Sequence, residues 1–221
     1  MLFLPYTIDT VTEKRPFTNW IIIALCVVMF AFECVSPPSD WMMFVLDGWS
    51  LSGLVGHMFL HGGIFHLAGN MIFLWVFGNT VCGNSGNVIY GALYLFYGIM
   101  AASAHVIVTG TPAVGASGAI NGVVGMAVAM YPLNRVGVFY WIFIRFGTFR
   151  MPLWILAFIW FLFDVRGALT NAEDVAYWAH IGGFLAGLCA GMIAIEKNWI
   201  VLSAYDNESL LDILLRRPRT R

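Results

Sequence analysis

The stretch Val114-Gly115-Ala116-Ser117-Gly118-Ala119-Ile120 opens the fourth of six apolar segments in the chain. Gly115 and Gly118 flank Ser117, with Ala116 between, and no charged residue stands near it in the sequence. A helix is expected to begin here in apolar surroundings, where an unpaired hydroxyl is costly. The serine therefore needs a hydrogen-bond partner, and the candidates are a few histidines and asparagines on other segments.

The composition identifies a polytopic membrane protein. Of the 221 residues, 60% are hydrophobic and 10% are charged, and the mean hydropathy is +0.81. Ordinary globular domains contain about 25% charged residues. The formal net charge of −1 gives no global attraction to nucleic acid, so no nucleic-acid partner is expected. The cysteines show no CxxC or regular spacing, and neither a disulfide framework nor a metal site is expected from Cys26, Cys34, Cys82 and Cys189.

Six segments are long enough, or nearly so, to cross the membrane as helices, which takes roughly 20 residues for about 30 Å of hydrocarbon. They are Phe17–Val35, His61–Val81, Val88–Val108, Ser117–Tyr131, Pro152–Leu169 and Val175–Ile195. We therefore expect an all-α bundle of six transmembrane helices over residues 17–195, with an N-terminal segment 1–16 and a C-terminal tail 196–221. The aromatic, nearly uncharged stretch Ser39–Gly56 is interpreted as an embedded or interfacial loop and not as a seventh span.

The lysines and arginines predict the orientation of the bundle, because they favour the cytoplasmic side. With the N-terminus in the cytoplasm, Arg166 alone falls outside, and the residues that fall inside are Lys14, Arg15, Arg135, Arg145, Arg150, Lys197, Arg216, Arg217, Arg219 and Arg221. Both termini are therefore predicted to be cytoplasmic. A six-helix core without an added helix or soluble domain favours a prokaryotic plasma membrane.

The fourth segment is too short to cross the membrane fully. Ser117–Tyr131 has 15 residues, which make about 22 Å of helix and leave Ser117 about 8 Å below the outer surface. At this depth, unpaired backbone is tolerated only where it is buried in protein or lines a water-filled cavity. The preceding residues Pro112–Gly115 are therefore predicted to line a cavity.

Polar side chains of two other segments are expected at the same depth. Counting residues along the second and sixth segments puts His66 and His180 about 8 Å below the outer surface. Asn70 follows His66 by one helical turn on the same side. Close packing of the fourth and sixth segments is predicted by small residues at four-residue steps, which are Gly118 and Gly122 on one and Gly183, Gly187 and Gly191 on the other.

Ser117 and His180 are a candidate nucleophile and general base. A serine hydroxyl is a weak nucleophile until a neighbouring base takes its proton, and neutral histidine is the commonest base near neutral pH. Acyl transfer also needs donors aimed at the developing oxyanion. His66, the Asn70 amide and the Ser117 backbone N–H at a helix N-terminus are the candidates.

The chain resembles the rhomboid family of intramembrane serine proteases in three motifs that occur in the family's order. They are Gly115-Ala116-Ser117-Gly118, His61-x4-His66-x3-Asn70, and Ala179-His180-Ile181-Gly182-Gly183. The resemblance covers about Phe17 to Ile195. It implies a Ser117/His180 dyad without an acidic third member, and an oxyanion hole formed by His66, Asn70 and the Ser117 N–H.

The resemblance also carries expectations about substrate and entry. Family members cleave transmembrane segments of other proteins near their outer end, need no cofactor, and admit substrate after a loop and the fifth helix move. His61 would be a structural or water-retaining residue at the cavity mouth. Where many bacterial members have a tyrosine that stacks on the histidine, this chain has Asn121. His180 must then be oriented by another group, or Asn121 hydrogen-bonds it.

Several alternatives remain open. A catalytically silent rhomboid-like protein that binds membrane clients is the main one, and a b-type haem protein with His66 and His180 as ligands is another.

His57 and His61 have the spacing of a metal-ligand pair but lack a suitable third ligand nearby. Asp164 could complete a Ser/His/Asp triad, although its place beside Arg166 at a helix end suits a local ion pair better. His105 is expected at the membrane interface.

Overall fold

The computed structural model describes residues 2–170, 175–200, 202–203 and 206–217. In this part of the chain all six apolar segments are helical. They form α1 (Phe17–Val35), the continuous run of α3 (Ile64–Phe73), η4 (Leu74–Gly78) and α4 (Asn79–Ser85), then α5 (Asn87–Val108), α6 (Ser117–Met130), α7 (Leu153–Leu169) and α8 (Tyr177–Glu196). Residues 171–174 of the predicted outer loop, and the tail residues Arg219 and Arg221, lie outside the described residues.

Four of the described helices are long and apolar enough to cross a membrane, judged by length and composition. They are Phe17–Val35, Ile64–Ser85, Asn87–Val108 and Tyr177–Glu196. Helix α6, with 14 residues, is shorter than a membrane-crossing helix, as the sequence predicts for the segment that begins at Ser117.

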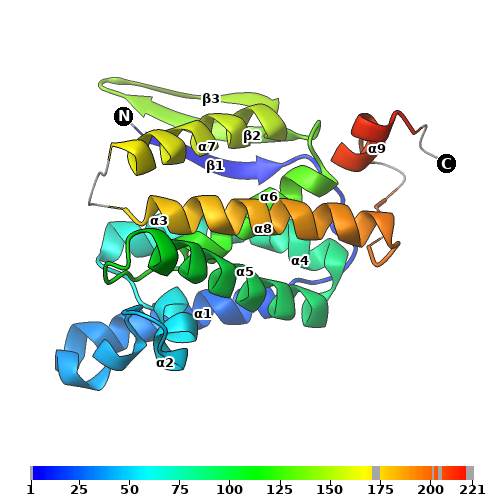
Figure 1. Cartoon of the computed structure of the whole chain (residues 1–221). Helices are drawn as coiled ribbons and strands as arrows, with labels where there is room; N and C mark the ends of the chain where they lie inside the picture. Colours follow the sequence, from blue (N-terminus) through cyan, green and yellow to red (C-terminus); the bar gives the residue numbers. More distant parts are fainter. Residues whose placement is uncertain (1, 171–174, 201, 204–205, 218–221) are drawn as a thin grey trace.

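The chain also contains a three-stranded antiparallel sheet, so the prediction of an all-α fold is wrong at this point. Its strands are β1 (Leu2–Ile8), β2 (Arg135–Ile142) and β3 (Arg145–Pro152), in the order β1-β2-β3. The sheet and α7 lie on one side of the helix bundle, and α1 lies on the opposite side (Figure 1). Val136 and Val138 of β2 are buried in the core, which ties the sheet to the bundle.

The region between α1 and α3 forms short helices and no span. They are η1 (Pro38–Asp40), η2 (Met42–Phe44), α2 (Leu51–Gly56) and η3 (His57–Phe59). Leu46 and Ala113 exchange two backbone hydrogen bonds of 3.0 Å, which attach this region to the loop that leads into α6. At the other end of the described chain, α9 (Leu210–Leu215) follows the bundle.

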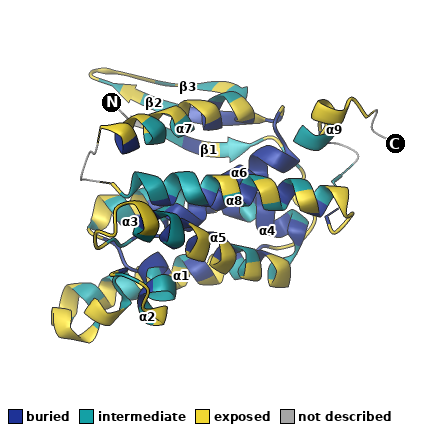
Figure 2. Ribbon diagram, viewed as in Figure 1, coloured by how far each residue is buried: buried dark blue, intermediate teal, exposed yellow. Residues whose placement is uncertain are grey.

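Helix α6 lies at the centre of the bundle. Every residue from Gly118 to Met130 is buried except Asn121. Parts of α1 and α7 are exposed instead (Figure 2), and their exposed apolar residues include Val28 and Phe163, which are 63% and 61% exposed. Apolar side chains on the outside are expected where helices face lipid, because the bilayer core is as apolar as they are.

Helices α6 and α8 pack backbone against backbone. A Cβ atom added to Gly183 would overlap the carbonyl group of Gly118, and one added to Gly187 would overlap that of Gly122. The close approach predicted from the glycine spacing is therefore confirmed. It brings the helix that begins with Ser117 within reach of His180.

Replacing Gly187 by alanine is expected to destabilise the bundle by about 1–3 kcal/mol, because a methyl group would force α6 and α8 apart. The measurement is the midpoint of thermal unfolding in detergent, followed by circular dichroism. Gly69→Ala is the matched control, since nothing lies within 4 Å of its added Cβ and alanine favours the helix. An unchanged midpoint for Gly187→Ala would contradict the backbone packing.

Helix α7 contacts the second apolar segment through aromatic side chains. The ring of Trp160 lies 4.9 Å from that of Phe73 and 6.1 Å from that of Phe77, measured between ring centroids. These are contacts between the ends of long side chains, unlike the backbone contact between α6 and α8. Helix α7 also contacts α8, where the ring centroids of Phe161 and Phe184 lie 5.2 Å apart.

Buried Asn19 joins α1 to the π-helical turn η4. Its amide donates to the Leu74 carbonyl at 2.8 Å and to Asn79 Oδ1 at 2.9 Å, and its oxygen accepts from the Tyr90 hydroxyl at 2.7 Å. Single π turns inside α-helices often occur at functional sites. Here the network fixes the C-terminal half of the helical run 64–85, whose N-terminal half carries the candidate oxyanion donors His66 and Asn70.

Candidate active site

Ser117 and His180 are in direct contact. Ser117 is the first residue of α6 and His180 is the fourth residue of α8, and Ser117 Oγ lies 2.9 Å from His180 Nε2. Both side chains are half-buried. The predicted hydrogen bond between the two helices is therefore present.

The second ring nitrogen of His180 contacts Asp164 on α7. The distance from His180 Nδ1 to Asp164 Oδ1 is 2.8 Å, and each side chain is 14% exposed. The preferred interpretation of Asp164 as a local ion-pair partner of Arg166 is wrong, because Arg166 is exposed and takes part in none of the ion pairs among the described residues. The expectation that His180 has no acidic neighbour is also wrong. Ser117, His180 and Asp164 form a line in which His180 contacts both other side chains.

Asn121 does not hydrogen-bond His180. Its side-chain amide donates to the Ser117 carbonyl at 3.0 Å, within α6. The ring of Tyr177 lies edge-on to that of His180, with centroids 6.3 Å apart and planes at 75°. Of the two alternatives that the sequence leaves open, His180 is thus oriented by other groups, namely Asp164 and Tyr177.

Gly115 permits the close approach of His66 to Ser117. Its φ of +131° lies in a region that favours glycine, and its N–H donates to the His57 carbonyl at 2.8 Å. A Cβ atom here would lie 2.7 Å from His66 Cε1 and 3.7 Å from Ser117 Oγ. A side chain at this position would therefore collide with the His66 ring.

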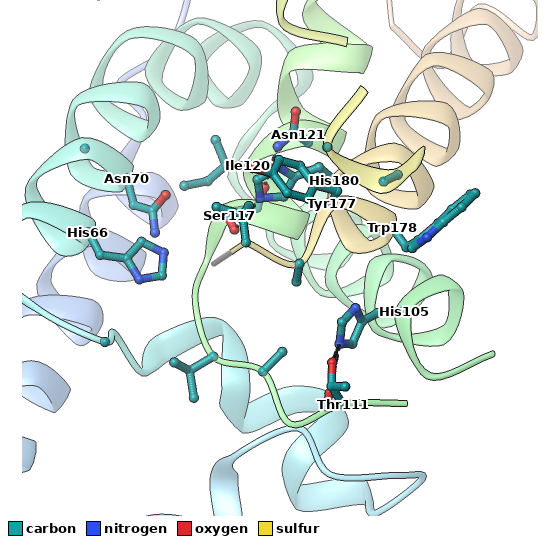
Figure 3. A pocket seen from close by; sticks show the side chains of 18 of the residues that line it. His66, Asn70, His105, Thr111, Ser117, Ile120, Asn121, Tyr177, Trp178 and His180 are labelled. Carbon is teal, nitrogen blue, oxygen red and sulfur yellow. Dashed lines mark hydrogen bonds between the residues drawn. The ribbon is translucent and has the colours of Figure 1, made fainter. Parts of the chain in front are cut away.

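A cavity of about 1220 Å3 opens at Ser117 and His180. Its walls include His66 and Asn70, which project from α3 towards Ser117 (Figure 3), and the non-helical residues 112–114. The predicted cavity beside Pro112–Gly115 is thus confirmed. Among the described residues, the buried Asn70 Nδ2 has no hydrogen-bond partner, and the Asn70 residue lines the cavity.

The two remaining histidines of this region, His61 and His105, are both buried. His61 is 2% exposed and is not among the residues that line the cavity, so its predicted place at the cavity mouth is wrong. Its backbone N–H donates to the Glu33 carboxylate at 3.3 Å. His105, whose interfacial position stays a prediction, is buried within the protein, and its Nε2 hydrogen-bonds the Thr111 carbonyl at 2.8 Å (Figure 3). It thereby holds the loop that leads to Ser117.

The contacts of His57 and His180 give little support to the two alternatives of a metal site and a haem site. His57 Nδ1 contacts the Gly53 carbonyl at 2.8 Å, and no group of three His, Cys, Asp or Glu side chains suited to a metal occurs among the described residues. A haem iron would need a free nitrogen on His180, yet its two nitrogens contact Ser117 and Asp164.

The contact between Asp164 and His180 could have been predicted from the sequence, because counting residues puts the two side chains at the same depth. Asp164 lies five residues before Leu169, the end of its predicted segment, which puts it about 7.5 Å below the outer surface. His180 lies five residues after Val175, the start of its own segment, and so at the same depth. Comparison of the two depths would have favoured a contact between the segments.

The comparison with known families gives one domain match, to the Rhomboid domain over residues 48–197. RHOMBOID-like protein 6, mitochondrial, of Arabidopsis thaliana is 29% identical over 164 residues, which are 72% of this chain and 50% of that protein. Presenilin-associated rhomboid-like protein, mitochondrial, of Homo sapiens is 30% identical over 146 residues, which are 64% and 37% of the two chains. Rhomboid protein 1, mitochondrial, of Saccharomyces cerevisiae is 27% identical over 158 residues, or 66% and 43%.

Two facts follow from these matches. The chain spans half or less of the length of these three relatives. All three carry names that place them in mitochondria, and this contradicts the prokaryotic plasma membrane predicted from the sequence, which is therefore wrong. The prediction failed because a compact six-helix core says nothing about which membrane holds it.

Proposed function

The chain belongs to the rhomboid family, and from this premise we propose that it is a serine endopeptidase that works within the membrane. It hydrolyses peptide bonds in or near the transmembrane segments of other membrane proteins. The observation that carries the proposal is the 2.9 Å contact between Ser117 Oγ and His180 Nε2 beside a cavity. A hydroxyl in contact with an unprotonated imidazole is the arrangement that activates a serine.

The two residues act in sequence. His180 Nε2 takes the proton from Ser117 as Oγ attacks the scissile carbonyl, and the imidazolium then gives that proton to the leaving amine. A water molecule next loses a proton to Nε2 and attacks the acyl group on Ser117. Collapse of this second intermediate returns the proton to Oγ and releases the new carboxyl end.

His66, Asn70 and the Ser117 backbone N–H form the proposed oxyanion hole. The unpartnered Nδ2 of Asn70, a residue that lines the cavity, supports its role, since this donor has no other hydrogen bond to give up. The Ser117 N–H belongs to the first turn of α6, where backbone donors have no partner within the helix. His66 lies against Gly115, next to the nucleophile.

Other residues have supporting roles. Gly118 and Gly183 allow the contact between α6 and α8, and Asn121 holds the first turn of α6 through the Ser117 carbonyl. Gly115 makes room for His66. Buried His61, whose ring centroid lies 5.3 Å from that of His66, supports the position of that side chain.

The partners are transmembrane protein substrates and the lipid bilayer, and the reaction uses no cofactor, metal or nucleic acid. We propose six membrane-crossing helices within residues 17–195, with the segment 1–16 and the tail 196–221 on the side that carries most lysines and arginines. The names of the relatives favour a mitochondrial membrane as the location.

A fluorophosphonate probe tests the proposal, because it reacts with an activated serine and not with an ordinary hydroxyl. Detergent-solubilised protein is incubated with the probe, and the adduct is located by mass spectrometry of peptides. We expect the adduct on Ser117, and its loss in His180→Ala. Labelling that is absent from the wild type, or undiminished in His180→Ala, would favour the alternative of a silent protein that binds membrane clients.

A further inference from the structure

Asp164 is the carboxylate that contacts His180, and it comes from a third helix. The 2.8 Å contact to Nδ1 lies on the side of the ring opposite to Ser117, whose Oγ contacts Nε2 at 2.9 Å. We propose, on the basis of the proposed function, that Asp164 is a positioning residue of the reaction. It fixes the tautomer of His180 and stabilises the imidazolium that forms when Ser117 gives up its proton.

The tautomer follows from the donor and acceptor properties of the three groups. An ionised carboxylate can only accept hydrogen bonds, so the proton of the neutral ring must reside on Nδ1 when Asp164 is its partner. Nε2 then carries a lone pair directed at Ser117 Oγ. This is the tautomer that a general base needs, because the opposite one would present an N–H to the serine and could not take its proton.

The charge of Asp164 has a second effect during the reaction. Proton transfer from Ser117 makes His180 positive, and a carboxylate at 2.8 Å lowers the free energy of that state more than a neutral acceptor would. Both side chains are 14% exposed, so water screens the interaction only partly. The benefit exists only once the proton has moved, and it therefore increases the rate and not the affinity for substrate.

The surroundings of Asp164 argue against a solvated surface charge. Helix α7 is otherwise strongly apolar, and an ionisable side chain in such a helix is costly unless it has a partner inside the protein. Arg166 is the other charged residue of α7, and it is exposed and forms none of the ion pairs among the described residues. The partner of Asp164 is therefore His180.

Asp164→Asn tests the proposal, with Arg166→Gln as the matched control on the same helix. Asparagine keeps the size and a neutral hydrogen bond but removes the charge. We expect kcat for a transmembrane peptide substrate to fall by about 10- to 100-fold, with KM unchanged and labelling by a fluorophosphonate slowed in parallel. Arg166→Gln is expected to behave as the wild type. Equal losses in the two variants, or a wild-type kcat in Asp164→Asn, would overturn the proposal.

A direct measurement covers the case in which Asp164→Asn does not fold. In wild-type protein labelled with 15N-histidine, the nitrogen shifts of neutral His180 report which ring nitrogen carries the proton. They are assigned by their loss in His180→Ala. We expect the proton on Nδ1, and a proton on Nε2 would overturn the proposal without any variant at position 164.

The outcome is separable from that of the proposed function. If Ser117→Ala keeps wild-type hydrolysis, the proposed function fails and the role of Asp164 fails with it. If Ser117→Ala is inactive while Asp164→Asn keeps wild-type kcat, only the role of Asp164 fails. Asp164→Glu keeps the negative charge on a longer side chain. Its kcat is therefore expected to lie between those of the wild type and Asp164→Asn. A purely structural role, in which the charge does not matter, would predict no such recovery.

Discussion

Ser117→Ala is expected to lower the rate of peptide hydrolysis by about 10^6-fold, since the nucleophile of a serine protease has no substitute. The protein is reconstituted in liposomes with a labelled peptide that contains one apolar segment of about 20 residues, and the products are identified by mass spectrometry. His180→Ala should reduce the rate about as strongly. The double variant should be no slower than either single variant, because nucleophile and base act as a unit.

Ser103→Ala is the matched control for this experiment. Ser103 lies on α5, is part of no proposed machinery, and donates its hydroxyl to the Ile99 carbonyl at 2.7 Å. Its replacement by alanine should leave hydrolysis unchanged. Cleavage by Ser117→Ala at the wild-type rate would show that the chain itself has no serine peptidase activity.

Asn70→Ala is expected to lower kcat by about 10^2- to 10^3-fold, the usual effect of removing one oxyanion donor. KM should change little, since the donor is needed when negative charge develops on the carbonyl oxygen. The measurement is steady-state hydrolysis of the same peptide in liposomes. The physical basis is the Asn70 Nδ2, which is buried and has no partner among the described residues, on a side chain that lines the cavity.

Asn84→Ala provides the matched asparagine control, near the C-terminal end of the same helical run. Its amide donates to the Thr80 carbonyl at 3.0 Å, far along the chain from the proposed oxyanion hole. It should keep the wild-type kcat. A loss in Asn84→Ala as large as that in Asn70→Ala would mean that both substitutions act through the stability of the helix.

Much of the helical part of the fold is predictable because a membrane gives every segment the same reference surface. Each helical residue adds about 1.5 Å, so distance along the sequence converts into depth. Depth counting placed Ser117, His180 and His66 at one level, and the structure brings Ser117 into contact with His180 and His66 against Gly115. Helix α6 begins at Ser117, as the glycine-flanked stretch predicts.

The sheet was not predicted because its signals are weak and non-local. The two-residue connection between β2 and β3 is Phe143-Ile144, and it lacks the glycine or asparagine that marks a tight hairpin. Phe143 itself takes the unusual φ of +53°. β1 then pairs with β2 across most of the chain, with Phe3 opposite Tyr140, and no local pattern reports such a pairing.

The role assigned to Asp164 from the sequence was wrong for a geometric reason. Arg166 stands two residues away, and side chains separated by two residues do not face each other on a helix. A local ion pair was therefore a poor expectation from the start. The carboxylate faces a different helix, where it contacts His180.

The three members of the line Ser117, His180 and Asp164 do not rest on equally rigid supports. Ser117 and His180 lie on α6 and α8, which pack backbone against backbone. Asp164 lies on α7, which contacts the second apolar segment through the Trp160 and Phe73 rings. Trp160 and Asp164 are four residues apart and so share one face of α7. A tilt of α7 that parts the rings thus also withdraws the acid from the imidazole. The proposed effect of Asp164 on His180 therefore requires α7 to be packed against the bundle, so any displacement of this helix would also change the strength of the base.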